Sequence, residues 1–306
     1  MKALAGQTAI YGVSSILGRM INFLLVPLQT AVLSQSAYGI NVDFYSLIAF
    51  LIVVVTFGME TAYFRYSEQE GFDEGKVFGA GLAMIALVLA SLGLFVLLFQ
   101  NELLHSLRWE ETPEYLYFFM AILALDALSA LPFARLRRTN KAVRFAGIKL
   151  ALILSNVLIN LYIFLPAYWE LHGNVGYWSH EMRGVGYIFV ANFWAAVLMF
   201  ALLLPTLFPL QLNLDKKYVK TLLVFGIPLL IGGLAGIANE MLDRQLLKYL
   251  LPKENAYAGV GIYGAVYKIS IFLILFNQAF RYAAEPFFFK NAKTKDGPER
   301  MSTVMD

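Results

Sequence analysis

Eight long apolar stretches, separated by short polar segments, constrain this chain more than any other feature of its sequence. A helix needs about 20 apolar residues to cross the hydrocarbon core of a bilayer, and each stretch reaches that length. Together they predict an all-α integral membrane protein with about eight transmembrane helices, over residues 8–33, 42–64, 77–99, 114–134, 146–166, 184–208, 219–247 and 260–284.

The composition agrees with membrane insertion. Hydrophobic residues make up 59% of the chain and charged residues 15%, whereas soluble domains average about 45–50% and 25%. The mean hydropathy is +0.64. The first stretch is too long for the core of a signal peptide and has no small-x-small cleavage site, so we expect it to remain as the first span. The absence of cysteine excludes disulfides, thiol catalysis and thiolate metal sites.

The basic residues of the connecting segments are distributed unevenly between the two sides of the membrane. With the N-terminus inside, sixteen lysines and arginines fall on the cytoplasmic side. The external segments hold four, at Arg108, Arg183, Lys248 and Lys253. Because cytoplasmic loops are enriched in positive charge, this asymmetry predicts that both termini are cytoplasmic.

Arg19 is a single charge near the middle of the first span. An arginine at a helix centre costs roughly 2.5–3.5 kcal/mol of insertion free energy, so it needs water or a partner. At 100° per residue, five polar side chains of this span fall within about 80° of one another. They are Tyr11, Ser15, Arg19, Asn22 and Gln29. This face either lines a polar pathway or forms a packed polar seam between helices.

Three other spans carry polar stripes. Span five places Lys149, Asn156 and Asn160 on one face, and span seven does the same with Gly232, Gly236, Asn239 and Asp243. The stripe of span eight comprises Tyr263, Tyr267, Ser270, Gln278, Arg281 and Glu285. Spans three and six have almost no polar residue apart from Ser91 and Asn192, so they can face lipid all round. The striped spans are expected to share a polar interior.

The sequence contains an internal repeat. A Tyr-Gly pair stands at the start of span two (Tyr38-Gly39) and again at the start of span eight (Tyr263-Gly264). The number of residues between these pairs equals the number between Glu60 and Glu285, near the ends of the same spans. Six spans separate the copies, so both copies have the same membrane orientation, which makes this a parallel repeat. The repeat predicts a six-helix lobe over residues 1–212 and the first two helices of a second lobe over 213–306. We expect the remaining spans of that lobe to follow Asp306.

Three segments carry a resemblance to a known family. They read AGQTAIYGVSSILGRMINFLLVPLQT (residues 5–30), SAYGINVDFYSLIAF (36–50) and FGMETAYFRY (57–66). Through these motifs the chain resembles bacterial polysaccharide and lipopolysaccharide biosynthesis membrane proteins, the oligosaccharide-lipid flippases. They belong to the multidrug/oligosaccharidyl-lipid/polysaccharide exporter superfamily. The resemblance implies two six-helix lobes in a V, alternating access, and export of undecaprenyl-pyrophosphate-linked oligosaccharide to the periplasmic leaflet of the inner membrane.

A flippase for such a substrate needs cations inside the membrane to meet the pyrophosphate, and polar groups to meet the sugars. The candidates for substrate binding are Arg19, Asn22, Asn156, Asn160, Lys268, Gln278 and Arg281, and Arg244 is a further cation. Asp126 and Asp243 are candidates for a coupling ion or proton, because a carboxylate away from water can carry a proton. Alternatively, Arg281 pairs with Glu285, and Asp243 pairs with Arg244 or Arg19.

The sequence does not indicate an enzyme. It has no phosphate-binding loop motif and no H-E-x-x-H motif, and His105, His172 and His180 all fall in external segments. We therefore expect no catalytic residue, no metal and no cofactor. The expected partners are the lipid-linked oligosaccharide and membrane lipids, with other polysaccharide assembly proteins as further candidates, and no nucleic acid. The basic segment at 135–144 fits contact with an anionic leaflet. The alternatives are a multidrug or lipid II exporter and a membrane polysaccharide polymerase.

Overall fold

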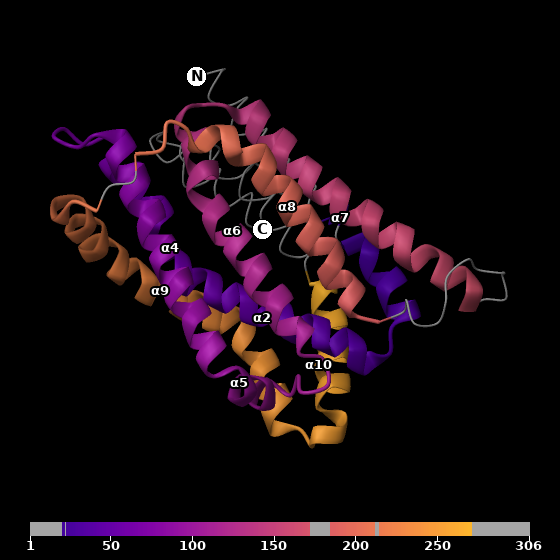
Figure 1. The fold of residues 1–306 in the computed structure, drawn as a ribbon. Coiled ribbons are helices and arrows are strands. Elements are labelled where there is room, and N and C mark those ends of the chain that lie inside the picture. Colours follow the sequence, from indigo (N-terminus) through magenta and orange to yellow (C-terminus); the bar gives the residue numbers. More distant parts are fainter. Residues whose placement is uncertain (1–19, 22, 172–183, 212–213, 271–306) are drawn as a thin grey trace, which may run out of the picture. The chain divides into compact units, whose positions relative to one another are not determined.

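The computed structural model describes residues 20–21, 23–171, 184–211 and 214–270 (Figure 1). The regular structure in these ranges is helical throughout. After a helix over Phe23–Val32, the helices are α2 (Gln35–Thr56), α3 (Met59–Tyr66), α4 (Glu74–Leu98), α5 (Gln100–Leu107), α6 (Glu114–Arg138), α7 (Ala142–Leu171), α8 (Gly186–Leu207), α9 (Lys216–Leu250) and α10 (Lys253–Ile269).

Six helices in these ranges are long and apolar enough to cross a membrane, with α2 and α3 counted as one span over Gln35–Tyr66. They match the second to seventh predicted spans, which are thereby confirmed as helices. The first and eighth predicted spans are described only in part, by Phe23–Val32 and α10. The chain is thus an all-helical, multi-pass membrane protein over the described residues.

Local sequence explains where several of these helices begin. The side chain of Ser34 accepts a hydrogen bond from the backbone N–H of Ala37, and Asp73 caps α4 in the same way through the N–H of Lys76. The second span is divided at Phe57 and Gly58, whose φ angles of 29° and 74° lie in the left-handed region. Glycine adopts such a conformation without steric cost, so the chain ends α2 and starts α3 here.

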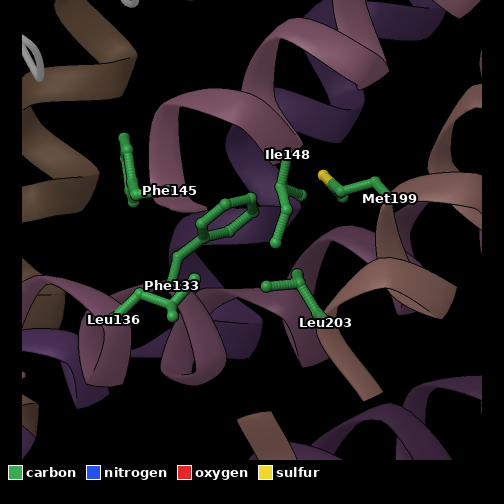
Figure 2. Packing of buried hydrophobic residues seen from close by; sticks show 6 residues of the cluster. All are labelled: Phe133, Leu136, Phe145, Ile148, Met199 and Leu203. Carbon is green, nitrogen blue, oxygen red and sulfur yellow. The ribbon is translucent and has the colours of Figure 1, made fainter. Parts of the chain in front are cut away.

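Helices α6, α7 and α8 pack side by side and hold part of the apolar core (Figure 1). Figure 2 shows six buried residues of this core, namely Phe133, Leu136, Phe145, Ile148, Met199 and Leu203. The prediction that spans three and six can face lipid all round is therefore wrong for both, because α4 also has fully buried side chains, at Phe78 and Ile85. On α8, Phe189 and Leu203 are fully buried, and small residues such as Ala191 and Ala195 let the neighbouring helices approach closely. Apolar periodicity cannot distinguish a lipid face from a packed face.

Helix α9 lies antiparallel along α2 and α3. Close to the start of α2, Lys248 meets Asp43, and at the other end of the span Gly226 lies against the backbone oxygen of Phe57. Gly58 packs on Leu229 beside that contact. One long helix therefore contacts the second span near both of its ends.

Helix α10 crosses α2 through glycines. A Cβ on Gly39 would lie 1.8 Å from the backbone oxygen of Tyr257, and a Cβ on Gly261 would lie 2.1 Å from that of Gln35. Gly264, the repeat equivalent of Gly39, meets Val42 one turn further along α2. The two helices therefore run in the same direction, which is the relation that a parallel repeat predicts for its equivalent helices.

By internal contacts the chain divides into one unit over Met1–Gly264 and another over Ala265–Asp306. The structure describes residues 265–270 of the second unit, which end α10. The predicted division into lobes at residues 212 and 213 rests on the repeat and stays a prediction.

Candidate functional site

A chain of four amides, three of them buried, joins three helices of the predicted first lobe. The side-chain N–H of Gln29 donates to the Asn160 carbonyl oxygen at 3.0 Å, and Asn160 in turn donates to the oxygen of Asn156 at 3.2 Å. Asn156 donates to the carbonyl oxygen of Asn192 on α8 at 2.6 Å. We call these four residues the amide chain. It connects the helix over Phe23–Val32 with α7 and α8 through hydrogen bonds, which is how buried polar groups are satisfied in a membrane.

The amide chain decides between the two interpretations of one polar residue in the first span. Gln29 is 5% exposed and bonded to Asn160, so at this position the polar face is a packed seam. The prediction that Asn156 and Asn160 share a face is confirmed, since they are hydrogen-bonded to each other. Both amides already have protein partners, so either would have to exchange a partner to bind a sugar hydroxyl.

Asp126 lies in α6, the helix that packs against α7 and α8. It interacts electrostatically with Lys149 of α7, whose ammonium lies 4.3 Å from the centre of the Phe133 ring. The hydroxyl of Tyr45 on α2 is buried within electrostatic range of Asp126 and close to Asn192. The carboxylate of Asp126, the predicted coupling residue, thus lies within electrostatic range of both an ammonium and a phenol.

Asp243 on α9 is held by its neighbours. The Arg244 guanidinium donates to one carboxylate oxygen of Asp243 at 3.0 Å, and the hydroxyl of Tyr263 on α10 donates to the other. Arg244 also donates to the backbone oxygen of Glu240. The alternative in which Asp243 pairs with Arg244 is therefore observed, and Arg244 is 5% exposed.

A fully buried ion pair joins α2 to α9. The Lys248 ammonium lies 2.6 Å from one carboxylate oxygen of Asp43, and both side chains are 0% exposed. Gln245 donates to the other oxygen of Asp43 and to the Ser46 hydroxyl, each at 2.8 Å. We call Asp43, Ser46, Gln245 and Lys248 the Asp43 clasp. The prediction that Lys248 lies in an external segment is wrong, because Lys248 belongs to the last turn of α9 and its side chain is buried.

Aromatic rings surround the lysine of the clasp. The Lys248 ammonium lies 5.4 Å from the ring centres of Tyr249 and Tyr257 and 5.9 Å from that of Trp109. Such distances allow cation–π attraction, which offsets part of the cost of burying the charge. Arg108 stacks over Tyr249 at 5.4 Å and interacts electrostatically with Asp43.

A second set of ion pairs lies at the end of the second span opposite to the Asp43 clasp. Arg135 donates to Glu74 at 3.1 Å, Arg138 to Glu68 at 2.7 Å, and Arg137 to Glu60. The Tyr63 hydroxyl also donates to Glu74, at 2.5 Å. We call Glu60, Glu68, Glu74, Arg135, Arg137 and Arg138 the arginine cluster. It ties α6 to α3, α4 and the loop between them. Each of the three guanidinium groups in this basic segment thus has a carboxylate partner within the protein.

Several predicted site residues cannot be placed. Arg19, Asn22, Gln278 and Arg281 lie outside the described residues, and the pairing of Arg281 with Glu285 stays a prediction for the same reason. Lys268 is half-buried in the last turn of α10. The structure therefore brings together Asn156 and Asn160. It places Asp126 within electrostatic range of Lys149 and Tyr45, while Asp243 lies in a separate group.

The Asp43 clasp was missed at the level of sequence. The sequence contained one signal for it. Asp43 is a carboxylate inside a predicted span, and a charge in that position needs a partner. The partner could not be read from spacing, since Lys248 is 205 residues away.

Comparison with known proteins identifies the family. The family described as polysaccharide biosynthesis protein matches residues 4–292. The fold is similar to that of one solved structure, called "protein A", with a TM-score of 0.53 and 17% identity. The alignment covers 89% of this chain and 61% of that one, so this chain spans less than two thirds of its length. No curated protein matches. A profile match over nearly the whole chain shows that this multi-pass membrane protein belongs to the polysaccharide biosynthesis protein family.

Proposed function

We propose that this protein moves undecaprenyl-pyrophosphate-linked oligosaccharide from the cytoplasmic to the periplasmic leaflet of the bacterial inner membrane by alternating access, with both termini in the cytoplasm. The observation that carries the proposal is the match of the polysaccharide biosynthesis family to residues 4–292 of a chain with at least six membrane-spanning helices. A polysaccharide precursor that is linked to a lipid is held in the membrane. A multi-pass membrane protein of this family can therefore reach it and move it between the two leaflets.

The buried polar groups support transport of a polar head group. Asn156, Asn160 and Gln29 occupy the interior of the first lobe, where a protein needing only stability would be served by apolar packing. The pyrophosphate would be met by Arg19, Lys268 and Arg281, because guanidinium and ammonium groups form charge-assisted hydrogen bonds with phosphate oxygens.

Asp126 is the proposed coupling residue. It lies inside the membrane-spanning part of α6, beside Lys149 and Tyr45, so protonation or cation binding at its carboxylate would change the charge of this group. Asp243 is the weaker candidate, because Arg244 and Tyr263 already occupy both of its oxygens. Asp126→Asn is expected to reduce export while leaving membrane levels unchanged.

Complementation of a flippase-deficient strain tests the proposal, with the protein expressed as its gene encodes it. Surface polysaccharide and the amount of protein in the membrane are measured together. Wild type should restore polysaccharide, Arg19→Ala should abolish it, and Arg19→Lys should restore it partly because the charge remains without the bidentate fork. The matched control is Arg144→Ala, an exposed arginine at the end of the bundle, which should complement fully. Absence of complementation by well-expressed wild type would contradict the proposed function.

Orientation is tested separately with single cysteines in this cysteine-free chain. Asn140 and Glu111 are exposed in the segments before α7 and α6. Asn140→Cys should resist an impermeant maleimide added to intact spheroplasts, and Glu111→Cys should react. Reaction of Cys at position 140 from outside would reverse the proposed topology.

A further inference from the structure

The Asp43 clasp lies between the two predicted lobes. Asp43 and Ser46 belong to α2 in the first lobe, whereas Gln245 and Lys248 belong to α9, the first helix of the second. We propose that this clasp is a gate contact, which closes the end of the bundle where α2 begins and separates during each transport cycle. This inference rests on the proposed function, since alternating access requires such a contact.

The ion pair has properties that static packing does not call for. Both charges are removed from water, and their mutual attraction has to offset the desolvation of each. Replacing a buried ion pair with apolar residues of similar size is often neutral or stabilising. If the contact never opened, an apolar pair would hold it at least as well. An ion pair differs from an apolar pair when the contact opens. Water then hydrates both charges, and this hydration lowers the free energy of separation.

The surroundings of the clasp can separate without unfolding a helix. The hydroxyl of Tyr249 donates to the backbone oxygen of Ser106 at 3.0 Å, and that of Tyr257 to the oxygen of Leu107 at 2.9 Å. Both bonds end on the short helix α5 of the first lobe, and water can replace them. At Gly39 and Gly261 the two backbones touch without interlocking side chains, so the surfaces can part.

The second contact of α9 with this span has a different character. Gly226 packs on the backbone of Phe57, and Leu229 packs on Gly58, through backbone and apolar atoms. These positions coincide with the break between α2 and α3, where the chain already has left-handed dihedral angles. The contact can act as a pivot while the Asp43 clasp opens, because small residues at a helix contact permit rotation with little steric loss.

Thiol reactivity measures opening directly. Ser46 is 3% exposed in the clasp, so Ser46→Cys creates a single buried thiol in a cysteine-free chain. Its rate of reaction with an impermeant maleimide added from the external side is measured in cells. Glu102→Cys, at an exposed position on α5, is the fast control. Adding Lys248→Met strands the Asp43 carboxylate and should raise the rate at position 46 roughly a hundredfold, since breaking one partner of a buried pair strongly favours its opening.

The apolar double variant Asp43→Leu/Lys248→Met distinguishes a gate from a static contact. It should return the thiol at position 46 to a rate at or below that of Ser46→Cys alone, because the closed state is stabilised. Membrane levels should equal wild type, yet surface polysaccharide should be lost, since the contact no longer opens. A static role predicts normal levels and normal polysaccharide.

Two results would overturn the gate. One is full complementation by the apolar double variant, and the other is an unchanged rate at position 46 after Lys248→Met. Failure of the proposed function has a different signature, because wild type itself would then not restore polysaccharide while the labelling rates still report on opening of the clasp.

Discussion

The Asp43 clasp and the arginine cluster both tie helices together through ion pairs, but they do so in opposite ways. The clasp is one dry pair, with both side chains fully buried. The arginine cluster has several pairs that water reaches, with side-chain exposures of 13% and 22% for Arg135 and Glu74 and 68% for Glu68. The clasp joins the two predicted lobes, whereas the cluster joins helices of the predicted first lobe alone.

The difference shows how charge can be used for two purposes. Several half-exposed pairs contribute little each and are screened by salt, but together they keep α3, α4 and α6 in register when any one is lost. A single ion pair that is shielded from water loses its whole stabilising effect when either partner is removed, because the remaining charge is then uncompensated. A permanent connection within a lobe suits the first arrangement, and a contact between lobes that must open suits the second.

Lys248→Met should produce the largest effect and tests the clasp itself. We expect it to lower the free energy of unfolding by about 3–5 kcal/mol, because it leaves Asp43 charged and buried without its partner. The thermal unfolding midpoint of the detergent-purified protein measures the loss. The apolar double variant Asp43→Leu/Lys248→Met is the control and should recover stability. Equal instability of both variants would mean that packing around the lysine stem, and not charge, holds the clasp.

Gly39→Ala should be next in size and tests the packed part of the same interface. The added Cβ would lie 1.8 Å from the backbone oxygen of Tyr257, so α10 has to shift away from α2. A cost of about 3 kcal/mol is expected for such overpacking against backbone. Gly93→Ala is the matched control, because a Cβ there meets nothing within 4 Å. That variant should be neutral or slightly stabilising. Wild-type stability in Gly39→Ala would contradict the glycine crossing.

Arg135→Ala should have a moderate effect and tests the least exposed pair of the arginine cluster. The guanidinium bonds Glu74 and the backbone oxygen of Thr206, each at 3.1 Å, and stacks on Phe78 at 4.6 Å. We expect a loss of about 1.5 kcal/mol, as for a hydrogen bond to a charged group. Protein levels in the membrane should stay near wild type, because the other pairs remain. A loss as large as that of Lys248→Met would remove the distinction between the two networks.

Glu68→Gln should have the smallest effect. Its carboxylate pairs with Arg138 at 2.7 Å, but the side chain is largely exposed. Such a pair contributes about 0.2–1 kcal/mol and is screened by salt. The unfolding midpoint should fall slightly at low salt and equal wild type at about 1 M salt, where the Debye length is about 3 Å. A larger loss that persists at high salt would show that the cluster acts as one cooperative unit.

Part of the candidate site followed from periodicity. Asn156 and Asn160 are one helical turn apart, which is why their shared face could be predicted and why they are found bonded to each other. Their partners could not be predicted. Gln29 and Asn192 lie on other helices, and spacing along one helix gives a face without saying which face of which neighbour it meets.

The break in the second span had no visible signal either. Residues 42–64 form one apolar run, and Gly58 within it could have been tolerated in a continuous helix. The structure ends α2 at Thr56 because Phe57 and Gly58 take left-handed angles where they pack on α9. A contact with a helix far along the chain decides this local conformation.

The sequence by itself determined that this protein is a bundle of membrane-spanning helices, where most spans lie, and which family it resembles. Those properties depend on the length and apolar character of local segments, because each span must satisfy its backbone hydrogen bonds internally. Only the tertiary structure decided that span six is packed and that Asp43 pairs with Lys248. Such pairings depend on which faces meet across more than 200 residues of chain, where local periodicity carries no information.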